Sequence, residues 1–118
     1  YFDKDQLTNK NMRFFISEII REKILVQFQK EVPYSCEVVV EEYLEDDDII
    51  RIRTNIMVSR DTQRAILIGH QGEKIKKLGI ASRIDIEAFV LKKVHLELYV
   101  KVDKDWRNKD GKLKKYGY

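Results

Sequence analysis

Apolar residues recur at steps of three and four between residues 9 and 30, and this spacing predicts an amphipathic helix. The recurring positions are Met12, Phe15 or Ile16, Ile19 or Ile20, Ile24 and Phe28. Apolar side chains lie on more than one side of this helix, so we expect it to pack broadly against a sheet. Pro33 ends the segment, because proline cannot continue a helix.

Three segments alternate apolar and polar residues, a pattern typical of strands with one buried face. They are residues 34–44, 50–59 and 94–102. The acidic cluster from Glu45 to Asp48 separates the first two by a short turn, so we expect these two strands to form an antiparallel hairpin. One side of the three strands carries Val38, Val40, Ile50, Ile52, Thr54, Ile56, Val58, Val94, Leu96, Leu98, Val100 and Val102.

Two further helices are predicted at residues 62–68 and 73–91, with a turn from Gly69 to Gly72 between them. Gly79 lies inside the longer helix at a cost of about 1 kcal/mol relative to alanine, so it marks close packing, a kink or a break. The candidates for burial in this helix are Ile75, Leu78, Ile84, Ile86 and Phe89.

The resulting order is helix, strand, strand, helix, helix, strand. A three-stranded sheet with one apolar face needs covering, and three helices on that face would cover it. The predicted fold class is therefore α+β with two layers. Since a helical crossover joins the second and third strands, we expect those two strands to be parallel if they are neighbours.

Length and charge refine this picture. The chain has 118 residues, which fits a single domain over residues 1–118. Its net charge is only +3, but eight acids and no Lys or Arg lie between Glu31 and Asp48, whereas the tail from Lys101 to Tyr118 holds seven bases and three acids. Such a separation of acidic from basic segments suggests a basic face that meets a polyanion. The alternative is that both charged runs are ordinary solvated faces.

Several classes of protein are disfavoured by composition. Cys36 is the single cysteine and the two histidines are far apart, so we expect no disulfide, no metal site and an intracellular domain. No apolar run approaches the length of a membrane span, and no signal peptide is visible. Because the chain starts at Tyr1, we expect it to be part of a longer protein.

The segment from Ile66 to Lys76 carries the most informative motif, I-x-I-G-x-x-G-x-x-I-K. Glycines at both corners of the turn let a nucleic-acid backbone approach main-chain N–H groups without hindrance from Cβ atoms. The helix that follows points its positive N-terminal end at the same place. Apolar residues before the turn would line a groove, and lysines after it would meet phosphates.

This motif within this element order resembles the type II KH domain, an RNA-binding module. Further segments are similar to the C-terminal domain of the bacterial GTPase family Era. They are residues 17–25, 33–35, 51–53, 85–87, 96–102, 105–108 and 113–118, which together span nearly the whole chain.

The Era resemblance implies binding of the single-stranded 3′ end of small-subunit (16S) ribosomal RNA and a role in maturation of the small subunit. It also implies a cytoplasmic protein with peripheral contact to the inner membrane. GTP and magnesium would bind a separate N-terminal GTPase domain. This chain has no G-x-x-x-x-G-K-[ST] stretch, so we expect no cofactor here.

The resemblance also implies roles for individual residues. The turn that clamps the RNA backbone would be Gly69, His70, Gln71 and Gly72, the apolar wall under the bases would be Ile66, Ile68 and Ile75, and the phosphate contacts would be Arg64, Lys74, Lys76 and Lys77. Relatives often have a lysine in or beside the turn, so Lys74 is expected to replace that charge. For the three isoleucines, plain core packing is the alternative.

Other residues leave their roles open. Trp106 either stacks on a base or packs the tail against the domain. His70 has no neighbouring acid or nucleophile in a catalytic pattern, and the run from Asp46 to Asp48 lacks the spacing of a calcium loop.

Three classes of function are therefore compared. The first is an RNA-binding module. The second is an interaction domain that contacts its own GTPase domain, ribosomal proteins or a membrane surface. The third, an enzyme, has only scattered acids and two histidines in its favour.

Overall fold

The computed structural model describes residues 9–29 and 36–103. Its elements are α1 (Asn9–Phe28), β1 (Cys36–Glu45), β2 (Ile49–Val58), α2 (Asp61–Ile68), the 3-10 turn η2 (His70–Gly72), α3 (Glu73–Val90) and β3 (Lys93–Val102). This order confirms the predicted α-β-β-α-α-β arrangement. The expectations for Pro33, Trp106 and the basic tail beyond residue 103 lie outside the described residues.

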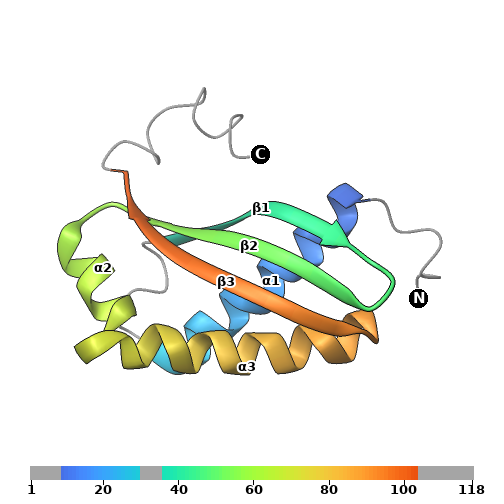
Figure 1. Cartoon of the computed structure of the whole chain (residues 1–118). Coiled ribbons are helices and arrows are strands. Elements are labelled where there is room, and N and C mark those ends of the chain that lie inside the picture. Colours follow the sequence, from blue (N-terminus) through green and yellow to red (C-terminus); the bar gives the residue numbers. More distant parts are fainter. Residues whose placement is uncertain (1–8, 30–35, 104–118) are drawn as a thin grey trace.

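The strands form one mixed sheet in the order β1-β2-β3, with β1 antiparallel and β3 parallel to the central strand β2. Both the hairpin and the parallel crossover were predicted. Helices α1 and α3 lie against one face of the sheet, and α2 lies near the end where β2 and β3 finish (Figure 1). The two layers expected from the sequence are therefore present.

A bulge in β1 changes which residues face the helices. The pairing of β1 with β2 shifts between Val40 and Glu42, so that Val40 pairs with Thr54 and Tyr43 with Ile52. One extra residue moves every later side chain to the other face. Tyr43 therefore enters the core with only 7% of its surface exposed, which simple alternation did not predict.

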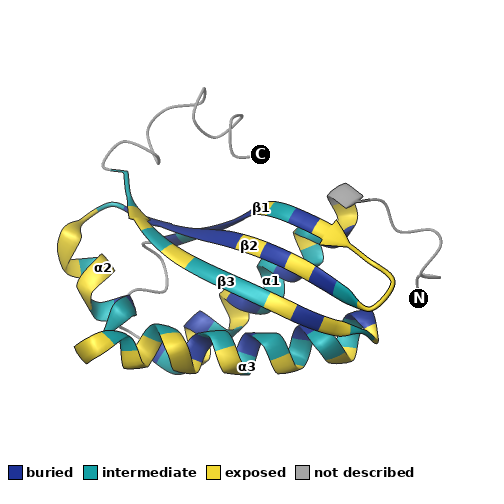
Figure 2. Ribbon diagram, viewed as in Figure 1, coloured by how far each residue is buried: buried dark blue, intermediate teal, exposed yellow. Residues whose placement is uncertain are grey.

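The core lies between the helices and the inner face of the sheet (Figure 2). On α1 the buried residues recur at every fourth position, which selects Ile16 and Ile20 from the predicted alternatives. All predicted inward positions of β2 are buried. The members of the core on these two elements are Met12, Ile16, Ile20, Ile24, Phe28, Ile50, Ile52, Ile56 and Val58.

The prediction for Ile84 was wrong. On α3 the residues at positions 78, 82, 86 and 90 are buried, whereas Ile84 is 56% exposed. Ile84 follows Ser82 by two residues, which is about 200° of rotation around the helix and therefore the opposite side. Gly79 neither breaks nor kinks α3 within its described span, and a Cβ there would meet only the Leu98 Cδ1 atom at an ordinary 3.8 Å.

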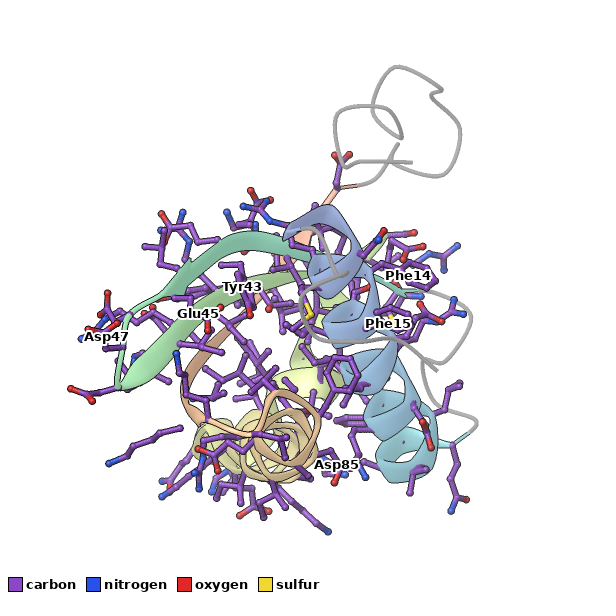
Figure 3. The ribbon with its side chains drawn as sticks, turned by 90° about the vertical axis from the view of Figure 1, so that its right-hand side faces the viewer. Phe14, Phe15, Tyr43, Glu45, Asp47 and Asp85 are labelled. Atoms are coloured by element: carbon purple, nitrogen blue, oxygen red, sulfur yellow. The ribbon has the colours of Figure 1, made fainter. Side chains whose placement is uncertain are left out.

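Several contacts join α1 to α3 along their length. The rings of Phe15 and Phe89 lie 5.7 Å apart between centroids. Lys23 Nζ lies 2.6 Å from Asp85 Oδ2, and this hydrogen bond raises the pKa of Lys23. Figure 3 shows Asp85 on the side of α3 that faces α1. Two further contacts, described below, lie where α3 begins.

Two hydroxyl groups in the core lack partners, and one of them gives a stability test. Thr54 Oγ1 and Ser82 Oγ are fully buried with no hydrogen-bond partner within the described part of the chain. Thr54→Val should raise the free energy of unfolding by about 1 kcal/mol, because it removes a desolvated polar group at nearly constant shape. Urea denaturation followed by circular dichroism measures the change.

The exposed Thr62→Val variant is the matched control and should change stability by no more than about 0.5 kcal/mol. If Thr54→Val instead lowered stability, the hydroxyl of Thr54 would have a hydrogen-bond partner in solution, contrary to the structure.

Candidate nucleic-acid interface

The chain reverses between α2 and α3 through backbone conformations that favour glycine. Gly69 has φ 75° and ψ −177°, a region that is essentially restricted to glycine. Gln71 and Gly72 are left-handed, with φ of 55° and 76°. The Gly72 N–H donates to the Gly69 carbonyl at 3.3 Å and closes the turn. The motif therefore needs its two glycines for different backbone shapes.

Main-chain N–H groups collect where the turn meets α3. No side chain of the described residues caps the N-terminus of α3, which begins at Glu73. His70 and Gln71 are exposed beside it. Consecutive N–H groups in left-handed and helical conformations, with the positive end of a helix dipole behind them, form a site for an anion. This place is therefore the candidate anion site.

The predicted apolar wall is partly buried. Ile66, Ile68 and Ile75 have intermediate exposure, and Ile66 and Ile75 also pack against the core. Each of these two residues thus contacts the core and keeps an exposed part. The fully buried residue of α2 is Leu67, which sequence reasoning did not single out. Because Leu67 belongs to the core, its side chain anchors α2.

The four predicted phosphate contacts are exposed but point to different surroundings. Lys76 and Lys77 form no ion pair with any residue that the structure describes. Arg64 Nε donates to the Val100 carbonyl at 3.3 Å, which links α2 to β3. Lys74 Nζ lies 5.9 Å from the centre of the Phe28 ring at the end of α1. Arg64 and Lys74 are thus engaged with different elements, β3 and α1.

The outer edge of β3 offers hydrogen-bonding groups that sequence reasoning missed. β3 pairs with β2 alone among the described strands. On its outer side the Val94 N–H donates to Glu87 Oε2 at 2.9 Å, and the Val100 carbonyl accepts from Arg64. Because strand residues alternate in direction, the N–H and C=O groups of Leu96 and Leu98 also point outward. Only the strand order, which places β3 at an edge, reveals this row of donors and acceptors.

Comparisons with known proteins agree with this geometry. A family model described as KH domain matches residues 31–107. The chain is 46% identical over 121 residues to "GTPase ERA1, chloroplastic" of Zea mays, and the match covers 100% of this chain. It spans 29% of the length of that curated relative.

Two solved structures of Era are also similar, each with a TM-score of 0.85 and 33% identity. One is a variant of Aquifex aeolicus Era bound to GDP and aluminium fluoride, of which the match covers 40%, together with 99% of this chain. The other is Era in complex with MgGDPNP and nucleotides 1506–1542 of 16S ribosomal RNA, where 100% of this chain matches 40% of that one.

Alanine at each glycine of the turn should have unequal effects. A Cβ on Gly69 would lie 2.5 Å from Lys74 Cγ and 2.8 Å from Lys74 Cβ, whereas one on Gly72 would meet only Ile75 Cγ2 at 4.0 Å. Gly72→Ala should lower the free energy of unfolding by about 1 kcal/mol, the cost of a left-handed residue. Gly69→Ala should cost about 3 kcal/mol, because overlap with Lys74 adds to the backbone strain.

Thermal and urea unfolding of both variants measure this difference. Equal losses, or a larger loss for Gly72→Ala, would contradict the described packing of Lys74 over Gly69.

Proposed function

The chain belongs to the KH domain family, and we propose that it binds a single strand of RNA, the 3′ end of small-subunit (16S) ribosomal RNA. As a KH domain it is a binding module and not an enzyme. The observation that carries the proposal is the turn from Gly69 to Gly72, whose exposed residues His70 and Gln71 adjoin the uncapped start of α3 and the lysines that follow. The likeness to an Era structure that holds nucleotides 1506–1542 of 16S ribosomal RNA supports this choice of RNA.

The geometry suggests how a strand would lie. A phosphate would accept hydrogen bonds from the N–H groups of His70 and Gln71, since those of Gly72 and Glu73 already donate to the carbonyls of Gly69 and His70. Lys76 and Lys77 would add attraction that falls with salt. Bases would rest on Ile66, Ile68 and Ile75 and present their edges to the outer side of β3. A single strand of RNA can make these contacts, because its bases are unstacked and its 2′-hydroxyl groups are exposed.

The rest of the molecule's role follows from the same proposal. Residues 1–118 would form one RNA-binding module with a basic tail, within a longer Era-like GTPase whose separate domain binds GTP and magnesium. The longer protein would assist maturation of the small ribosomal subunit. A cytoplasmic location and peripheral contact with the inner membrane are part of this proposal, although the maize relative is named as chloroplastic. None of the described helices is both long and apolar enough to span a bilayer.

Two acidic substitutions in the turn test RNA binding directly. His70→Asp with Gln71→Asp should weaken binding at least about tenfold, because two negative charges would face the phosphate. Fluorescence anisotropy with a strand that copies the 3′ end, beside a scrambled strand and at two salt concentrations, measures the effect. Both positions are exposed, so the fold should survive.

Ile84→Asp with Ala88→Asp is the matched control, since it adds the same charge on an exposed side of α3 far from the turn. This control should bind RNA like the unmodified chain. Unchanged affinity of the variant with two acidic residues in the turn would reject the proposed site. Equal binding of the unmodified chain to the native and scrambled strands would reject the proposed RNA.

A second candidate function is suggested by an apolar stripe on α3. Ile80, Ile84 and Leu91 are 47%, 56% and 82% exposed, and the exposed Ala88 lies between the last two. The stripe is about 16 Å long and about 10 Å wide. Its area is therefore roughly a fifth of the 800 Å² or so that each partner of a stable complex buries. It is therefore too small for a free partner. We propose that it contacts the remaining part of an Era-like polypeptide, where tethering supplies a high effective concentration.

Cysteine labelling tests this contact. Two proteins are compared: the chain alone, and a chimera in which the chain replaces the matching 29% of the maize GTPase. Ile84→Cys should react with a maleimide at least about tenfold more slowly in the chimera, because burial protects a thiol. Leu44→Cys, at an exposed site of β1, the edge strand opposite β3, should react equally in both proteins. Equal rates for Ile84→Cys in the two proteins would exclude the contact.

A further inference from the structure

Lys74 follows the turn by two residues, yet its contacts lead away from the proposed path of the RNA. Its carbonyl accepts a hydrogen bond from Gln27 Nε2 at 2.9 Å. Its ammonium group lies 5.9 Å from the centre of the Phe28 ring, within the range of a cation–π contact. Gln27 and Phe28 are both at the C-terminal end of α1, so Lys74 connects α1 to the start of α3.

The stem of Lys74 also fills the space over Gly69. Its Cβ and Cγ atoms are so close to Gly69 that a Cβ at that position would overlap them. An aliphatic stem can cover an apolar or main-chain surface while the charged end remains in water. The stem therefore blocks one side of the turn, and the ammonium group is directed toward Phe28 rather than toward the exposed His70 and Gln71.

We propose that Lys74 is a positioning residue that fixes the backbone of the Gly69–Gly72 turn from behind, and that its charge does not contact the RNA. This inference rests on the proposed function and changes the role that the Era resemblance implies for Lys74. Gln27 contributes to the same positioning, because its hydrogen bond to the Lys74 carbonyl fixes where α3 begins relative to α1. Lys76 and Lys77, by contrast, keep the role of phosphate contacts.

Salt dependence of RNA binding separates the two roles. Each phosphate contact contributes about 0.7 to the slope of log affinity against log salt for a single strand. Lys76→Met and Lys77→Met should each lower the slope by about that amount. Lys74→Met keeps the stem and removes the charge, so it should leave the slope unchanged and the affinity within about twofold. A slope for Lys74→Met that falls as much as that for Lys76→Met would overturn the proposal.

Truncation of the stem should have the opposite signature. Lys74→Ala removes the atoms over Gly69, so affinity should fall about fivefold or more, while the slope should stay unchanged as it does for Lys74→Met. Methionine thus rescues what alanine loses. Equal affinities for Lys74→Ala and Lys74→Met would show that the stem does not position the turn.

A measurement without RNA keeps this inference separate from the proposed function. In amide NMR spectra of the chain alone, Lys74→Ala and Gln27→Met should shift the signals of His70, Gln71 and Gly72, whereas Lys76→Ala should not. These shifts would support positioning even if the chain bound no RNA at all. Unmoved signals in both variants would reject positioning even if RNA binding were confirmed.

Discussion

The backbone conformation of Gly69 is the constraint on which the candidate site depends. Its φ of 75° and ψ of −177° let α2 end and α3 start within four residues. No other residue type adopts this conformation readily, and a Cβ would also overlap Lys74. The N–H groups of the turn, the positive end of α3 and the edge of β3 come together because this one residue permits the reversal.

Packing in the core holds α1 and α3 in place and so supports the turn between α2 and α3. Buried residues of α1 and α3 share one core with those of the sheet, and contacts between Phe15 and Phe89 and between Lys23 and Asp85 join the two helices. The hydrogen bond from Gln27 extends this contact to the first turn of α3. The site is therefore built on packed helices and an edge strand, which hold a main-chain anion site more rigidly than a free loop would.

Much of this could be predicted from the sequence, because hydrophobic periodicity and turn residues are local signals. The spacing of Ile16, Ile20 and Ile24, the alternation along β2 and the two glycines of the turn indicated the fold and the centre of the site. The rest depends on nonlocal geometry. The bulge that brings Tyr43 into the core, the exposed side of Ile84 and the direction of Lys74 are decided by neighbours that are distant in the sequence.

The most direct test of the account is a titration of the isotopically labelled chain with the 3′-end strand, followed by amide NMR. The account predicts that the signals of His70, Gln71 and Gly72 shift together with those of Leu96 and Leu98, because one strand would contact both the turn and the outer edge of β3. Shifts confined to the helix-free face of the sheet, with the turn unaffected, would contradict it.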